Sequence, residues 1–329
     1  MQQNINLADQ VSAEVNERVS PQAGLAIISP SGYAPEATVQ EGGLERGLAL
    51  LQQQGFRVQQ YYQHDQRYLR FGASDAVRLA QLHDAARNPD IDVVMALRGS
   101  YGLSRLLHLI DYDLLAESGK IFVGYSDFTA LNLALLAKTG QASYTGPMLC
   151  DDYTHVDPSP FTMAQFLACV QGPQHRVSVE TPQPNGQQEI EGTLWGGNLA
   201  MIGHLLGTPF FPQVEGGILF VEDISEHPYR VERLLLQLLH AGVLARQNAL
   251  ILGDFSGYKL SPYDNGFDFE QMLAFIRSQL KIPVFTGLPY GHIRARACLP
   301  IGASAQLSAS SDGFVLQMSS YPSLALLHS

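Results

Sequence analysis

Short apolar runs alternate with amphipathic stretches along the first half of the chain. Residues 24–29 (GLAIIS) form an apolar run that ends in Pro30-Ser31-Gly32, which predicts a strand followed by a turn. Residues 38–54 repeat leucines at helical spacing. The alternation continues with strands at 56–62, 91–97 and 120–124 and with helices at 75–87 and from 126 to 136. We therefore predict a parallel sheet with helices on both faces.

The composition changes after Met148. Residues 151–187 are rich in Asp, Pro, Gln and Gly, which predicts a connection between domains. A second block of strands and helices follows, with a Leu-rich helix that starts at Pro228 and two late strands joined by a Ser-Ser-Asp-Gly turn. We predict four segments: a polar extension over 1–23, an α/β domain over 24–150, a linker over 151–187 and a β-rich α/β domain over 188–329.

Composition and charge narrow the range of functions. Apolar residues make up 46% of the 329 residues and charged residues 16%, which is enough for sizeable cores. Lys and Arg number 20 against 31 Asp and Glu, a formal net charge of −11, and no basic cluster occurs. Such a chain is unsuited to nucleic acid and to anionic membrane surfaces. The binding partners that stay compatible with this charge are a small molecule, a peptide or another protein.

The cysteines and the N-terminal sequence indicate the cellular compartment of the protein. Cys150, Cys169 and Cys298 are scattered and no CxxC occurs, so neither a disulfide framework nor a cysteine zinc site is predicted. The first residues lack the basic and apolar regions of a signal peptide. No apolar stretch reaches the roughly 18–20 residues of a membrane span. We expect a soluble cytoplasmic protein.

Ser126 is the first candidate catalytic residue, because the general nucleotide-binding and metal-binding motifs are absent. No phosphate-binding loop, dinucleotide fingerprint or zincin motif occurs, and the ten histidines show no paired ligand spacing. In VGYSDFTA, Ser126 stands where an apolar strand ends and a helix begins, which is the position of a nucleophile elbow. Phe128 replaces the last glycine of the G-x-S-x-G pattern. Ser-Asp at such a junction is also typical of a helix N-cap, and the local sequence leaves both interpretations open.

A serine nucleophile needs a base and an acid that orients the base. His292 lies in a loop bounded by Gly and Pro (LPYGH), and Glu222 ends the apolar strand GILFVE. The stretch EDISEH that begins at Glu222 also fits a metal site, or the polar start of a helix in which Glu226 pairs with an arginine such as Arg230.

The loop Arg98–Gly102 (RGSYG) is the candidate for an oxyanion site. It follows a buried strand, and its two glycines free the backbone to direct N–H groups toward a developing negative charge. A tight turn between a strand and a helix explains the same residues.

Five stretches together resemble the LD-carboxypeptidases, the serine peptidase family that contains the murein tetrapeptide carboxypeptidases and the microcin-immunity peptidases. The stretches are ALRGSYG (96–102), VGYSDFTAL (123–131), GTLWGGNL (192–199), LFVEDISEHPYRVERL (219–234) and GLPYGH (287–292). They occur in consistent order from about Gly24 to the C-terminus.

The resemblance implies roles for individual residues. It implies that Ser126 is the nucleophile, Glu222 the acid and His292 the base. It also implies an oxyanion hole made of the backbone N–H of Asp127 and one N–H from the Gly99–Ser100 stretch, where Ser100 replaces the second glycine of the family pattern.

Further expectations follow from the same resemblance. Trp195 and Asn198 match family residues near the substrate cleft. The implied fold is a flavodoxin-like parallel-sheet N-terminal domain joined to a β-rich, swivelling C-terminal α/β domain, with the active site between them. A homodimer is implied, and neither a metal nor an organic cofactor is required.

We therefore expect a cytoplasmic serine LD-carboxypeptidase that removes the terminal D-Ala of murein tetrapeptides in peptidoglycan recycling. An exopeptidase must also recognise a free carboxylate, for which Arg230 is the nearest candidate in sequence, although an ion pair with Glu226 explains it equally well. Three alternatives stay open: a sibling serine peptidase that cleaves a peptidyl-nucleotide antibiotic, a non-catalytic binding protein of the same fold, and a nucleotide-binding α/β protein.

Overall fold

A six-stranded sheet organises the first half of the protein. The computed structural model describes residue 19, residues 22–184 and residues 186–327. The strand order is β2-β1-β3-β4-β5, all parallel, with β11 added antiparallel at the edge. The strands are β1 (Gly24–Ile28), β2 (Arg57–Gln60), β3 (Val93–Ala96), β4 (Ile121–Val123), β5 (Ser143–Thr145) and β11 (Leu299–Ile301). This order is that of flavodoxin-like folds, and the predicted parallel sheet is confirmed.

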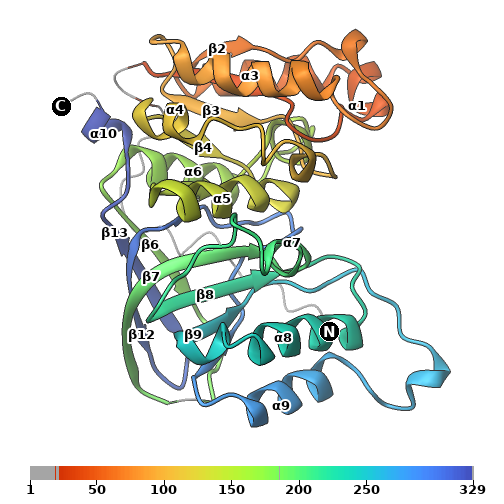
Figure 1. The fold of residues 1–329 in the computed structure, drawn as a ribbon, viewed down its shortest axis with the longest axis vertical. Coiled ribbons are helices and arrows are strands. Elements are labelled where there is room, and N and C mark those ends of the chain that lie inside the picture. Colours follow the sequence, from red (N-terminus) through yellow and green to blue (C-terminus); the bar gives the residue numbers. More distant parts are fainter. Residues whose placement is uncertain (1–18, 20–21, 185, 328–329) are drawn as a thin grey trace.

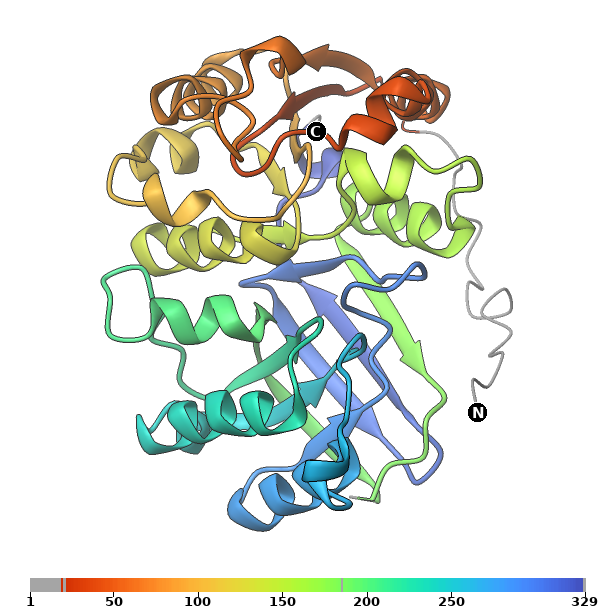
Figure 2. The same ribbon diagram turned by 90° about the vertical axis from the view of Figure 1, so that its right-hand side faces the viewer.

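Helices cover both faces of this sheet, with α3, α4 and α5 on one side and α2 and α6 on the other (Figure 2). They are α1 (Glu36–Gln40), α2 (Gly43–Gln53), α3 (Asp75–Arg87), α4 (Tyr112–Glu117), α5 (Thr129–Thr139) and α6 (Pro160–Gln171). Polar caps fix where several of them begin. The side chain of Ser74 accepts from the backbone of Val77, and that of Asp111 accepts from Leu114. The central strands β1, β3 and β4 are buried along their whole length, as a sheet covered on both faces requires.

A seven-stranded sheet organises the second half, with strand order β10-β9-β8-β7-β12-β13-β6. The strands β7 to β10 run parallel, while β12, β13 and β6 are added antiparallel. They are β6 (Gln174–Val179), β7 (Gln188–Asn198), β8 (Gly217–Glu222), β9 (Gln247–Leu252), β10 (Val284–Thr286), β12 (Ser304–Ala309) and β13 (Phe314–Ser319). The predicted β-rich second half is confirmed, including the hairpin of β12 and β13.

Three helices lie on one side of the second sheet: α7 (Leu199–Leu205), α8 (Pro228–His240) and α9 (Phe269–Gln279) (Figure 2). Helix α8 starts at Pro228 as predicted, because proline at the first turn loses no helical hydrogen bond. It buries Val231, Leu235 and Leu238, which follow each other at helical spacing. A last short helix, α10 (Leu324–Leu327), follows β13.

The two sheets meet along α5, which packs against α7 and β7 (Figure 1). The segment 151–187, for which only a connection was predicted, contains helix α6 and strand β6. Strand β6 alternates exposed and buried residues, with Val177 and Val179 inside. The predicted extension over 1–23 lies almost entirely outside the described residues. No helix in the described part of the chain combines the length and apolar character of a membrane span.

Candidate active site

Ser126 lies directly beyond the carboxyl end of β4, on a short 3₁₀ turn that leads into α5. Its φ of +61° lies in the left-handed region, which a residue with a side chain adopts only under strain. The approach to this turn is tight, because a Cβ on Gly124 would lie 2.7 Å from the ring of Phe128. This geometry matches the nucleophile-elbow interpretation of the sequence rather than that of a cap, because the N-cap position of the turn is Tyr125 and the Ser126 hydroxyl bonds to His292.

His292 joins Ser126 to Glu222. The Ser126 hydroxyl donates to His292 Nε2 over 3.0 Å, and His292 Nδ1–H donates to Glu222 Oε2 over 2.8 Å. His292 lies in the loop between β10 and β11, and Glu222 is the fully buried last residue of β8. Gly291 has a φ of +140°, and a Cβ there would lie 3.2 Å from Glu222 Oε2. The three residues predicted from separate parts of the chain are therefore brought together.

The carboxylate of Glu222 is itself held by Asn198. These residues are register partners at the ends of the parallel strands β7 and β8. Asn198 Nδ2 donates to Glu222 Oε1 over 3.2 Å and to Asp223 Oδ1 over 2.9 Å, while Asn198 Oδ1 caps α7. Burial raises the pKa of Asp223 to about 6. Asn198, predicted to be near the substrate cleft, thus contacts the carboxylate partner of His292.

A buried ion pair supports the other side of the histidine. Arg296 Nη2 donates to Asp152 Oδ1 over 2.6 Å, and both side chains are only 2% exposed. Arg296 Nη1 also donates to the carbonyl of Gly291 over 2.8 Å. Its guanidinium lies 3.6 Å from the ring centroid of Tyr125, whose ring meets His292 edge-on at 5.2 Å. Sequence reasoning missed this pair, because its members are 144 residues apart and burial of charge leaves no local pattern.

Asp127 fixes the loop that faces Ser126. Its Oδ2 accepts from the Ser31 hydroxyl over 2.6 Å and from the backbone N–H of Leu103 over 2.9 Å. Burial raises the pKa of the Asp127 carboxyl, and both hydrogen bonds oppose the rise. Gly99 lies against the serine: a Cβ there would be 3.0 Å from Ser126 Oγ and 3.5 Å from the Asp127 nitrogen. The candidate oxyanion residues therefore border Ser126.

Ser100 has a backbone conformation that glycine adopts without strain. Its φ is +83°, which is strained for a residue with a side chain. The Ser100 side chain lies close to Gly32, where a Cβ would approach to 3.0 Å. Its hydroxyl accepts from Arg70 Nη2 over 3.2 Å. No sequence signal singled out Arg70.

Trp195 does not lie where it was predicted. The indole is fully buried, its Nε1–H donates to Gln247 Oε1 over 2.8 Å, and its ring packs edge-on against Phe211 at 5.8 Å. A buried indole exposes no surface to a substrate, so Trp195 is a core residue in this structure. Asn198, three residues later, reaches the end of the strand, where the site lies.

The stretch that follows Glu222 forms ion pairs. Arg230 is half exposed on α8 and pairs with Glu226 one turn earlier, which is the alternative that the sequence left open for it. His227 Nε2 lies 3.1 Å from Asp264 Oδ1. Within the described residues, no group of three or more His, Cys, Asp or Glu side chains is placed to hold a metal ion.

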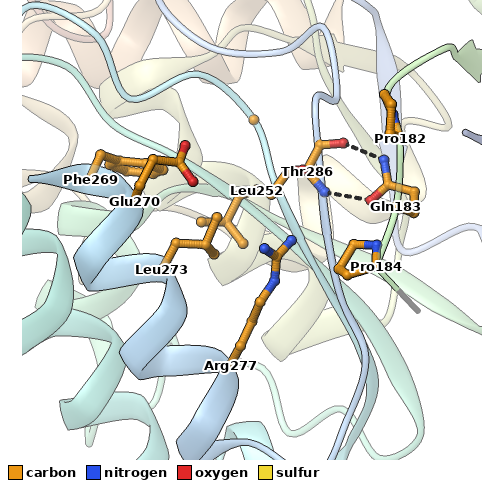
Figure 3. A pocket seen from close by; sticks show the side chains of 10 residues that line it. Pro182, Gln183, Pro184, Leu252, Phe269, Glu270, Leu273, Arg277 and Thr286 are labelled. Atoms are coloured by element: carbon orange, nitrogen blue, oxygen red, sulfur yellow. Dashed lines mark hydrogen bonds between the residues drawn. The ribbon is translucent and has the colours of Figure 1, made fainter.

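A separate pocket lies at the carboxyl ends of β9 and β10 (Figure 3). The amide of Gln183 bonds to both backbone groups of Thr286 and so completes the edge of β10, and Arg277 extends from α9 into the pocket. Arg277 Nη2 donates to the carbonyl of Val284 over 3.3 Å. The lining includes none of Ser126, Glu222 and His292, so any chemistry of these three takes place elsewhere.

Comparison with known proteins identifies the family. Residues 25–146 match the model of the LD-carboxypeptidase N-terminal domain, and residues 191–307 match that of the LD-carboxypeptidase C-terminal domain. The chain belongs to the LD-carboxypeptidase family of peptidases. The resemblance inferred from the five sequence stretches is confirmed.

Individual relatives extend over most of the chain. A probable murein peptide carboxypeptidase of Bacillus subtilis is 31% identical over 288 residues, which are 86% of this chain and 90% of that protein. The crystal structure of muramoyltetrapeptide carboxypeptidase from Oxalobacter formigenes is 48% identical, with a TM-score of 0.86, and covers 92% of this chain and 100% of its own. The microcin C7 self-immunity protein of Escherichia coli is 26% identical over 306 residues, 83% of this chain and 87% of that protein.

Proposed function

We propose that this peptidase is a serine LD-carboxypeptidase that releases the terminal D-Ala of murein tetrapeptides in peptidoglycan recycling. The bond cleaved joins the L-centre of diaminopimelate or lysine to D-Ala. The observation that carries the proposal is the chain of hydrogen bonds from Ser126 through His292 to Glu222, at 3.0 and 2.8 Å. Two of the relatives above are named as carboxypeptidases of murein peptides, which supports the substrate class.

In the proposed reaction Ser126 Oγ attacks the carbonyl carbon while His292 Nε2 takes the hydroxyl proton. Glu222 accepts from Nδ1–H, which keeps Nε2 free to act as the base and stabilises the imidazolium that forms. The imidazolium then gives its proton to the departing nitrogen, so D-Ala leaves as a neutral amine and an acyl-enzyme remains. Water, deprotonated by the same Nε2, hydrolyses the ester and restores Ser126.

The tetrahedral intermediate carries a negative charge that needs fixed donors. We assign this role to the backbone N–H of Asp127 and to one N–H of the Gly99–Ser100 stretch, because both border Ser126. The Asp127 carboxylate positions the loop by accepting from the N–H of Leu103. A single donor of this kind contributes about 10²–10³-fold to kcat in other hydrolases.

Three substrates that differ only at the C-terminal end test the proposal. Purified protein is incubated with a murein tetrapeptide ending in D-Ala, with the same peptide ending in L-Ala, and with the pentapeptide ending in D-Ala-D-Ala, and the products are identified by mass spectrometry. We expect conversion of the first peptide alone, to the tripeptide. Equal cleavage of the L-Ala peptide would contradict the LD specificity.

A peptidyl-nucleotide amide serves as the competing substrate, because one relative is a microcin self-immunity protein. Cleavage of this amide without cleavage of the tetrapeptide would favour the sibling peptidase. Cleavage of neither by folded protein would favour the non-catalytic alternative. Action in the cytoplasm and the homodimer stay predictions.

A further inference from the structure

A carboxypeptidase must bind the free carboxylate of its substrate close to the scissile bond. One residue separates that bond from the terminal carboxylate, and one residue spans at most about 3.3–3.6 Å. A planar guanidinium suits a carboxylate well because it donates two parallel hydrogen bonds. Arg230, the candidate from sequence, is paired with Glu226. We therefore expect the positively charged side chain that binds this carboxylate to lie beside the loop that borders Ser126.

Arg70 reaches this loop. Its Nη2 donates to Ser100 Oγ over 3.2 Å, and its guanidinium lies 5.7 Å from the ring centroid of Tyr101. Ser100 follows Gly99, which lies directly against Ser126. Arg70 is thus bound to the residue next to the one that contacts the candidate nucleophile.

The segment that carries Arg70 is also fixed to the loop. Tyr68 and Phe71 exchange two backbone hydrogen bonds, which makes a tight turn around Arg70, and Phe71 forms a bridge with Gly32. The N–H of Gly32 in turn donates to the carbonyl of Gly99 over 3.1 Å. The backbone at Arg70 is therefore held in place while its side chain is exposed.

Three neighbouring arginines have their charge compensated by a carboxylate. Arg67 pairs with Glu36, and Arg78 and Arg105 both pair with Asp75. A further neighbour, Arg98, has no carboxylate partner among the described residues, but it is partly buried and its Nη1 donates to the carbonyl of Tyr33.

Arg70 differs from the first three in its partners and from Arg98 in its exposure. Its described partners, a hydroxyl and an aromatic ring, are both neutral, and no carboxylate of the described residues lies within ion-pair distance of it. In a chain with a net charge of −11, this leaves an exposed, uncompensated guanidinium at the edge of the site.

We propose that Arg70 binds the C-terminal carboxylate of the peptide substrate, with the Ser100 hydroxyl orienting the guanidinium. This inference rests on the proposed function. It concerns a feature of this chain in particular, because Ser100 stands where the family pattern has a glycine that offers no side-chain acceptor. Arg70 acts in binding, and the steps at Ser126 do not involve it.

The test compares two substrates that differ only in terminal charge: the tetrapeptide ending in D-Ala, and the same peptide ending in D-alaninamide. Steady-state kinetics are measured for the native protein, for Arg70→Gln and Arg70→Lys, and for Arg67→Gln as the matched control. Arg67 lies three residues away, is also exposed, and is paired with Glu36.

We expect Arg70→Gln to lower kcat/KM for the acid about 10–100-fold, mainly through KM, because a hydrogen bond to a charged group is lost. The same variant should leave kcat/KM for the amide nearly unchanged, so that the preference for the acid disappears. Arg70→Lys should keep part of the preference, and Arg67→Gln all of it.

An equal loss on both substrates in Arg70→Gln, or an unchanged preference, would overturn the role of Arg70. The activity of the native protein on the acid is read first. If the native protein cleaves neither peptide, the proposed function fails and this inference falls with it. If it cleaves the acid and Arg70→Gln keeps the preference, only the inference fails.

Discussion

Replacing Arg296 by methionine tests whether the buried ion pair with Asp152 stabilises the part of the fold that holds His292. The variant leaves the Asp152 carboxylate, 2% exposed, without its counter-charge and the Gly291 carbonyl without its donor. Breaking a buried pair by removing one partner costs about 3–5 kcal/mol. This is a large share of the roughly 5–15 kcal/mol by which proteins are stable.

The assay is urea unfolding followed by the fluorescence of Trp195, which is the single tryptophan and is fully buried. Arg294→Met is the matched control, because Arg294 pairs with Asp157 at the surface, where the side chains are 60% and 83% exposed. We expect the control to lose at most about 1 kcal/mol.

The double variant Arg296→Met with Asp152→Asn completes a thermodynamic cycle. It removes both charges, so we expect it to be more stable than Arg296→Met alone, with a coupling of about 1–3 kcal/mol. A loss below about 1 kcal/mol in Arg296→Met, or a double variant that is no more stable than the single one, would refute this reasoning.

Three further predictions concern burial, orientation and strain. Burial lowers the pKa of His175 to about 4, so only the unfolded chain takes up this proton between about pH 6.5 and 4, and up to about 3 kcal/mol of stability is lost as the pH falls through that range. In urea unfolding at several pH values, His175→Gln should lose much less stability over the same range. Equal pH dependence of stability in the two proteins would contradict the role of His175. Asn198→Ala removes the donor to Glu222, so we expect kcat to fall about 10–100-fold, and an unchanged kcat would exclude a positioning role. Ser100→Gly should be more stable than Ser100→Ala by about 1 kcal/mol in thermal unfolding, because glycine accepts a φ of +83° without strain; equal stability would count against strain at this position.

Hydrophobic patterning predicted most of the parallel strands, because most of them, such as β1, β3, β4 and β8, are apolar runs between turn residues. It missed β6, whose exposed positions carry polar side chains, so the strand looks like part of a polar linker. Strand β7 runs through two glycines to Asn198. Gly196 continues the strand because its backbone lies against that of Phe220, where a Cβ would come within 1.9 Å of the carbonyl oxygen.

The candidate site was predictable where strand ends and the family resemblance coincided. Ser126 follows the buried strand β4, Glu222 ends the buried strand β8, and His292 was found in a loop bounded by Gly and Pro. The pair of Asp152 and Arg296 was not predictable, since only the tertiary fold buries it.

The structure places two further candidates away from the substrate-binding roles considered for them. Trp195 was expected near the cleft from the family resemblance, whereas its side chain packs into the core. Arg230 was left open between a carboxylate-binding role and an ion pair with Glu226, and the structure shows the ion pair.

The most direct test of the account is the release of D-Ala from the murein tetrapeptide by the native protein and by Ser126→Ala, measured side by side. We expect release by the native protein and a loss of at least about 10³-fold in the variant, with the urea transition of Trp195 retained to show that the variant is folded. Release at the native rate by folded Ser126→Ala would contradict the assignment of Ser126 as the nucleophile.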